Sequence, residues 1–252
     1  MMRYKAYNKG KSFLFLFFVL CLIFFNFLVA GVFTGCGLDV FYFVPEPVQA
    51  GYKPEVDNNL VDKKIFQFDT REGVGTGGFS VTGTDVYYKI YTNKSEWKSE
   101  SDSLKQMAEN NNVNAADKLI STGYGYGYQT LKIAGYNDNV LIPFTGSSKN
   151  VKIRLTSYFD MPEYSAKVES NDVNKGVPVR FNGKPFDFAR LGERDKPSLS
   201  DADIKGSSLP VDNKWYVCLF AVSRGHDAAY TNYYSNIAYL GSVTIDGNSK
   251  DN

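Results

Sequence analysis

Hydrophobic and polar residues along most of the chain follow the short alternating pattern of β-strands. In residues 151–156, apolar and polar side chains alternate one by one, as in a strand with one face buried and the other in water. Segments that are β-branched or aromatic and bounded by Gly, Asn, Asp or Pro predict the full set of strands, this one included: 65–70, 79–82, 85–92, 128–133, 140–144, 151–158, 164–169, 177–181, 214–223 and 237–245. The pattern predicts a mainly β fold, an antiparallel β-sandwich.

One segment departs from this pattern. Residues 99–120 are rich in helix formers, and Leu104, Met107 and Ala108 recur at helical spacing. Ser101 or Ser103 is the expected N-cap, and the asparagines at 110–112 predict a break. We therefore expect one or two short helices, inserted between strands.

A long apolar run precedes the β pattern. Residues 12–34 are almost wholly apolar and follow a stretch that contains four basic residues and no acidic ones. A basic segment followed by an apolar one is typical of a secretory signal, which predicts that residues 1–35 form a signal peptide. An uncleaved membrane anchor is the alternative, because the run is long enough to span a bilayer.

The residues Phe33, Thr34, Gly35 and Cys36 resemble the lipobox of bacterial lipoproteins, with Phe33 where Leu is usual. The resemblance implies cleavage between Gly35 and Cys36, with a diacylglyceryl group on the Cys36 sulfur and usually a third chain on its amine. Membrane lipid would then hold the exported chain at the cell envelope, since two or three acyl chains anchor stably. The following CGL…Y-F…P-E-P residues resemble the start of treponeme lipoproteins, which are spirochaete proteins.

The remaining chain divides by composition. Residues 36–59, which contain Pro45 and Pro47, are expected to form a lipidated tether or a first strand. Residues 60–246 hold the predicted sandwich, either as one domain with insertions or as two subdomains. Residues 247–252 are a polar tail.

Two segments carry a resemblance at the level of the fold. The residues YVCLFAV (216–222), and YSNIAYLG (234–241) after a loop, look like the last two strands of a fibronectin type III domain. The residues VYYKIY (86–91) look like its third strand, although the Trp expected on the second strand is absent. The resemblance implies a fibronectin III or immunoglobulin-like sandwich, and such folds mostly build spacers and binding surfaces.

Composition excludes several classes of function. With 28 basic and 27 acidic residues the net charge is +1, so we expect no nucleic-acid partner. One His and three Cys exclude a disulfide scaffold and most His-rich metal sites, and we expect no cofactor and no metal. Cys218 lies in an apolar strand, which predicts a buried, inert thiol; pairing with His226 as a nucleophile is the alternative.

Other chemical motifs in the sequence are weak. The glycines in 73–78 imitate a phosphate-binding loop, but a strand pattern follows them where a helix is required. Asp201 and Asp203 begin like a calcium loop, yet Lys205 stands where a ligand oxygen belongs, so a polar turn is expected. The carboxylates of Glu163 with Glu169, or of Asp187, Glu193 and Asp195, show no spacing that selects a catalytic pair.

Tyrosine is the unusual feature of the composition. Tyr124, Tyr126 and Tyr128 alternate with glycines and would share one face if extended. Three further tyrosines, Tyr230, Tyr233 and Tyr234, crowd the expected loop before the last strand. Exposed tyrosines favour a binding surface for a protein or glycan ligand, whereas packing on the sheets is the alternative.

The sequence thus predicts a non-enzymatic envelope lipoprotein, anchored through Cys36, whose β domain binds a ligand or acts as a scaffold. Two other functions stay open. One is an exported hydrolase acting on glycans, and the other is a structural subunit of an envelope assembly. A deep cleft with facing carboxylates would favour the hydrolase, and a shallow aromatic patch would favour binding.

Overall fold

The computed structural model describes residues 15, 17–23, 43–71, 78–136, 140–158, 161–190 and 196–247. The chain divides into two units, residues 1–41 and 42–252. In the first unit, residue 15 and residues 17–23 are helical. Among the described residues, no helix is both long and apolar enough to cross a membrane. Gly35 and Cys36, the predicted cleavage and lipidation site, lie outside the described residues.

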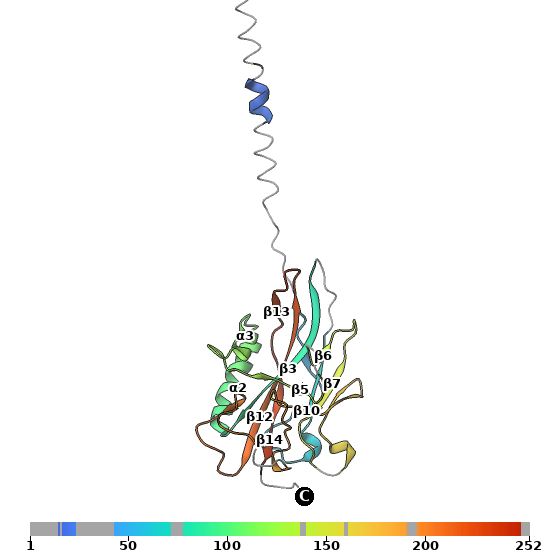
Figure 1. Ribbon diagram of the computed structural model, residues 1–252, viewed down its shortest axis with the longest axis vertical. Coiled ribbons are helices and arrows are strands. Elements are labelled where there is room, and N and C mark those ends of the chain that lie inside the picture. Colours follow the sequence, from blue (N-terminus) through green and yellow to red (C-terminus); the bar gives the residue numbers. More distant parts are fainter. Residues whose placement is uncertain are drawn as a thin grey trace, which may run out of the picture. The chain divides into compact units, whose positions relative to one another are not determined.

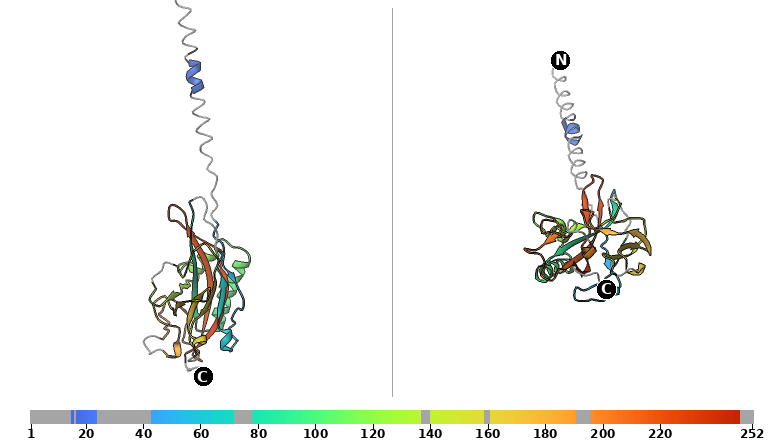
Figure 2. Two further views of the ribbon diagram at one scale, coloured as in Figure 1. Left: turned by 90° about the vertical axis from the view of Figure 1, so that its right-hand side faces the viewer. Right: turned by 60° about the horizontal axis from the view of Figure 1, so that its bottom comes forward.

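The second unit contains two main sheets and a pair of helices (Figures 1 and 2). The five-stranded sheet has the order β1 (Val48–Gln49), β2 (Phe66–Asp69), β7 (Asn150–Arg154), β8 (Lys167–Ser170) and β9 (Val173–Gly176), and every neighbouring pair is antiparallel. Short 3-10 turns occur at Val61–Lys63, Pro162–Tyr164 and Phe188–Arg190. Val48–Gln49 pairs with β2, so part of the expected tether is a first strand.

The seven-stranded sheet is built around two long strands, β3 (Ser80–Tyr91) and β12 (Lys214–His226), which pair antiparallel over almost their whole length. On its other side β12 pairs with β13 (Asn232–Tyr234) and β14 (Ala238–Asp246). Three short strands pair with β3: β4 (Gln129–Thr130), β6 (Ile142–Pro143) and, in parallel, β11 (Ile204–Lys205). A small third sheet joins β5 (Lys132–Ile133) to β10 (Pro178–Val179).

The main core lies between the two large sheets. Val86, Tyr88 and Ile90 point from β3 into this core, where they meet residues of the five-stranded sheet such as Phe68 and Ile153. The predicted antiparallel β-sandwich is thereby confirmed. The segments that resemble fibronectin type III strands, β3, β12 and β14, are hydrogen-bonded neighbours in that order.

Two helices, α2 (Lys94–Glu109) and α3 (Ala115–Ile120), cover the opposite face of the seven-stranded sheet (Figure 1). Tyr87, Tyr91, Cys218 and Phe220 alternate with the main-core residues of β3 and β12 and pack in this helix-side core. Both strands are therefore buried on both faces, which explains why 215–222 reads as a continuous apolar run.

The helical insertion is confirmed, but it begins earlier than predicted. The N-cap is Asn93, whose Oδ1 accepts a hydrogen bond from the Glu96 N–H at 2.9 Å. Ser101 lies inside α2 with its hydroxyl donating to the Lys98 carbonyl, so the expected cap at Ser101 or Ser103 is wrong. The first turn was missed because it carries mostly polar residues, and the capping Asn93 lies only two residues after the end of β3.

Candidate binding surface

The alternating tyrosines 124–128 do not share one face, because this segment is not an extended strand. Tyr124 is exposed, whereas Tyr126 is half-buried and donates its hydroxyl proton to the Ser103 hydroxyl at 2.9 Å. Tyr128 lies in the helix-side core, edge-on to Phe220 with ring centroids 5.6 Å apart. Tyr128 and most of Tyr126 therefore act in packing, which leaves Tyr124 as the exposed ring.

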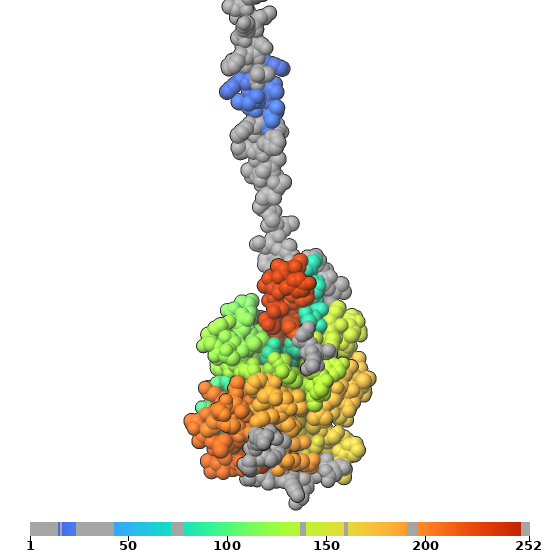
Figure 3. Space-filling view, in the orientation of Figure 1, coloured from blue at the N-terminus to red at the C-terminus, as the bar shows by residue number. Residues whose placement is uncertain are grey.

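The second tyrosine group lies on the hairpin formed by β12 and β13. The hairpin projects at one end of the domain and is the red surface at that end in Figure 3. Residues 227–231 form its turn, and we call residues 226–233 the hairpin tip. Tyr234 lies below the tip, half-buried against the helix-side core. The structure thus brings Tyr230 and Tyr233 together at the tip and assigns Tyr234 to packing.

Tyr230 is held in an unusual conformation. Its backbone φ is +62°, in the left-handed region that favours glycine or asparagine, and its side chain is 79% exposed. For other residues this conformation costs about 1–3 kcal/mol, so it persists only where the surrounding structure imposes it. The Tyr230 ring stacks on the ring of His226, with centroids 5.0 Å apart and planes 18° from parallel. The hairpin presents an aromatic ring to solvent at a strained position.

The turn below this ring is fixed by Asp227. Its Oδ1 accepts hydrogen bonds from the backbone N–H groups of Ala229 and Thr231, each at 2.9 Å. These bonds, foremost that of Thr231, lower the pKa of the Asp227 carboxyl. The carboxylate also accepts a hydrogen bond from the Tyr233 hydroxyl at 3.3 Å. The tip is consequently ordered, and its one carboxylate, that of Asp227, already accepts hydrogen bonds from residues of the tip itself.

The base of the hairpin is packed closely. The Tyr233 ring lies edge-on to Phe79, with centroids 5.8 Å apart. Gly225 leaves room for Phe79, because a Cβ at this position would meet the ring at 2.5 Å and the Ser80 carbonyl oxygen at 2.7 Å. A register shift between Arg224 and Gly225 accompanies this contact. Phe79, Gly225 and Tyr233 therefore fix the direction in which the tip projects.

Cys218 is buried, as its apolar strand predicts. Burial raises the pKa of its thiol to about 11, which disfavours the nucleophilic thiolate. His226 lies on the same strand, eight residues further along, which is about 26 Å at the rise of an extended chain. The alternative of a Cys218–His226 nucleophile is therefore wrong, because the two side chains lie too far apart for a hydrogen bond.

The predicted polar turn at 201–206 contains a buried ion cluster. The Arg180 guanidinium donates hydrogen bonds to both oxygens of Asp203, at 2.7 and 2.6 Å, and to Asp201 at 2.6 Å. Tyr88 donates its hydroxyl proton to the same Asp203 at 2.6 Å. Arg180 and Asp203 are fully buried. Both carboxylates therefore neutralise the buried Arg180 cation. In the described part of the chain, no group of three or more His, Cys, Asp or Glu side chains could hold a metal ion.

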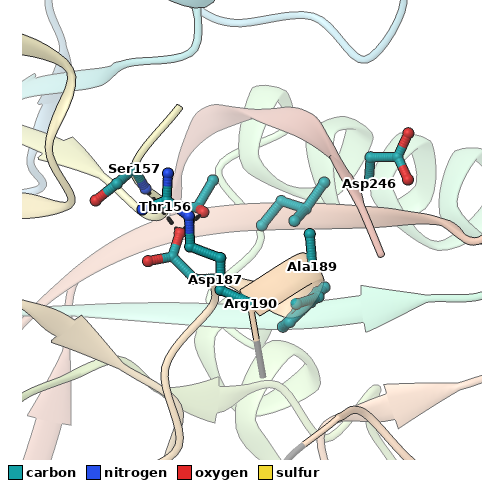
Figure 4. Close-up of a pocket in the computed structure, with 8 residues that line it drawn as sticks. Thr156, Ser157, Asp187, Ala189, Arg190 and Asp246 are labelled. Atoms are coloured by element: carbon teal, nitrogen blue, oxygen red, sulfur yellow. Dashed lines mark hydrogen bonds between the residues drawn. The ribbon is translucent and has the colours of Figure 1, made fainter. Parts of the chain in front are cut away.

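One carboxylate lines a small pocket near the end of β14 (Figure 4). Asp187 accepts hydrogen bonds from the Thr156 hydroxyl and from the Ser157 N–H, the latter at 2.8 Å. Burial raises the pKa of its carboxyl, while the Ser157 bond and the charge of Arg190 oppose the rise. The pocket volume of about 10 Å³ admits roughly one water molecule. Glu193 and Asp195, the other members of this carboxylate group, lie outside the described residues.

A larger hollow lies at the start of β12, the end of the strand opposite to the hairpin tip. Its volume is about 470 Å³. Two lysines line it together with apolar and small polar residues: Lys184, Phe188, Lys196, Pro197, Ser198, Leu209, Asn213, Trp215 and Gly247. Sequence reasoning missed this hollow, because its walls come from segments far apart in the chain.

The glycine-rich segment 73–78 lies outside the described residues except for Gly78. Strand β3 begins at Ser80, so a strand follows it, as the sequence pattern predicts.

Comparison with known protein families, with curated proteins and with solved structures found no match for this chain.

Proposed function

We propose that this chain is an exported envelope lipoprotein, anchored by acylated Cys36, whose β-sandwich is a non-enzymatic binding domain with the hairpin tip as its binding surface. The anchor proposal draws on the basic and apolar N-terminal segment and the lipobox resemblance. The observation that carries the binding surface is Tyr230, an exposed ring held at a left-handed backbone position.

The conformation of Tyr230 supports binding because packing does not explain it. A tyrosine that stabilises the fold is buried, like Tyr91, and one that fills a turn is better replaced by Gly or Asn. Tyrosine offers a large contact area and a hydrogen-bonding tip at low entropy cost, so interfaces are enriched in it.

The anchor is tested by metabolic labelling with a palmitate analogue in a bacterial host. Replacing Cys36 by Ser should abolish the label and leave an unprocessed precursor, because only a thiol accepts the diacylglyceryl group. Cys218→Ala is the matched control and should label like the unmodified chain, since Cys218 is buried in the domain. Equal labelling of the Cys36→Ser chain contradicts the lipoprotein proposal.

The exported glycan hydrolase is the second candidate, supported by the half-buried Asp187 with its raised pKa. The purified chain is incubated with envelope glycans, and new reducing ends are measured. Glycan cleavage that Asp187→Asn abolishes would replace the binding proposal by the hydrolase. Under the binding proposal, neither chain releases reducing ends.

A further inference from the structure

We propose that the ligand of the hairpin tip is the headgroup region of the same bilayer that carries the acyl chains, so that the domain docks on its own membrane. This inference rests on the proposed lipidation of Cys36. It is carried by three observations: the length of the connecting chain, the position at which that chain enters the domain, and the chemistry of the tip.

The connecting chain is short. Phe43 is exposed, whereas Val44 is buried, so the folded domain begins at this point. Seven residues from Cys36 to Phe43 span at most about 25 Å when fully extended. Four of the six intervening residues are Leu38, Val40, Phe41 and Tyr42, and apolar and aromatic side chains favour the membrane interface over water. The entry point of the domain is thus confined to the neighbourhood of the bilayer.

The entry point and the hairpin tip lie at the same end of the domain. Phe43 lines one hollow together with Arg71 and Asn236, and Asn236 follows β13 by two residues. Figure 1 shows the hairpin projecting at one end of the domain. From Asn236 to the turn the hairpin extends by four to six residues, roughly 13–20 Å. This projection is within the reach of the connecting chain.

The chemistry of the tip fits a lipid interface. Residues 225–236 contain no Lys, Arg or Glu, and the carboxylate of Asp227 already accepts two backbone hydrogen bonds. The exposed residues next to it are Ala228, Ala229 and Tyr230. Tyrosine is enriched at membrane interfaces, where its ring enters the apolar region and its hydroxyl stays among the headgroups. With no basic residue on the tip, docking should need neither anionic lipid nor low salt.

The test uses the lipidated chain, which begins at Cys36, in phosphatidylcholine vesicles. A bimane label is attached to a single introduced cysteine, Ala229→Cys beside Tyr230 or Val211→Cys at the opposite end of β12. Ala229 and Val211 are exposed, whereas Cys218 is buried and stays unlabelled. Brominated phosphatidylcholine then quenches any label that lies at the bilayer.

Docking predicts that the label at Ala229 loses most of its fluorescence while the label at Val211 keeps its own. Quenching at Ala229 should survive high salt and should decrease when Tyr230→Asn is added, because Asn keeps the left-handed turn without the ring. If the chain floats with the vesicles but neither label is quenched, or both are quenched equally, docking is overturned while the anchor stands. If the chain does not float with the vesicles, the anchor and the docking built on it are both overturned.

Discussion

Tyrosines in this chain serve opposite purposes, and burial separates them. Tyr128 is inside the helix-side core, where its hydroxyl lies 2.8 Å from that of Tyr91. Tyr230 is exposed and strained. Composition cannot distinguish the two, because each lies among further tyrosines and small residues. The sequence predicted a tyrosine-rich loop correctly at 230–231, but the left-handed backbone depends on the Asp227 turn and not on a local pattern.

Substitution should separate the two roles. Tyr230→Gly should leave the free energy of unfolding unchanged or raise it by up to about 1 kcal/mol, because glycine relieves the left-handed strain. Tyr128→Ala should lower it by about 3–5 kcal/mol, as removal of a buried aromatic ring does. Denaturant titration of both variants measures this. A loss at Tyr230 as large as that at Tyr128 would assign Tyr230 to the core.

Buried weak acids should make the domain sensitive to alkali. Burial raises the pKa of Cys218 from 9.0 to about 11 and raises the pKa values of Tyr91 and Tyr128 well above 10. The unfolded chain releases these protons at lower pH than the folded chain does. The stability they contribute is therefore fully present below pH 9 and is lost as the pH rises through about 11.

The urea midpoint should accordingly decrease from pH 8 to pH 10.5. The ionisation of Cys218 accounts for about 2 kcal/mol of the accompanying loss in the free energy of unfolding. In Cys218→Ala the decrease should be smaller, although the variant is less stable at pH 8. A native thiol that reacts rapidly with a maleimide at pH 8 would contradict the burial of Cys218.

At the scale of elements, the Arg180 cluster connects β10 and β11 to β3. Asp203→Ala should lower the free energy of unfolding by about 3–5 kcal/mol, because it leaves a buried guanidinium without its main partner. The double variant Arg180→Met with Asp203→Leu should be less destabilised than the single variant. Asp117→Ala, an exposed site on α3, is the control and should stay within about 0.5 kcal/mol. Equal small effects at Asp203 and Asp117 would contradict this role.

The hairpin offers a second prediction at this scale. Gly225→Ala places a methyl group against the Phe79 ring and the Ser80 carbonyl, and should lower the free energy of unfolding by about 1–3 kcal/mol. It should also reduce binding at the tip, because the tip changes direction. Gly123→Ala is the matched control, since a Cβ there meets no atom within 4 Å. Thermal unfolding of both variants compares them, and an unchanged midpoint in Gly225→Ala contradicts close packing.

Strands whose residues follow a clear hydrophobic pattern could be predicted from the sequence. Strands that exist because they pair with a neighbouring strand could not. Alternation predicted β7, and apolar runs predicted β12 and β14. The two segments expected at 79–82 and 85–92 are one strand, because Gly83 adopts a φ of +148° within β3 and interrupts the pattern without ending the strand. β9, β11 and β13 are short and polar, so their pairing partners determine them. Arg180 and Asp203 are far apart in sequence, which hid the ion cluster.

For the whole molecule, the sandwich and its helical insertion followed from the sequence, whereas the layering did not. The helices bury the second face of the sheet, so β3 and β12 have no solvent-exposed polar face. Their sequences therefore lack the polar alternation that would indicate the layers. The hollow beside Trp215 also depends on this assembly. β12 has 13 residues and therefore spans about 40 Å, so a domain that docks through its tip holds this hollow at about that distance from the bilayer.

The pairing of β3 with β12 also determines when the domain can fold. These two strands form the centre of the larger sheet, yet helices, loops and the remaining sandwich strands lie between them in sequence. Because a chain is synthesised from its N-terminus, β3 is made long before its partner strand β12. The central sheet must wait for β12 and β14, and pairing between such distant segments is intrinsically slow. The central sheet of a nascent chain therefore stays incomplete until its last strands have been synthesised.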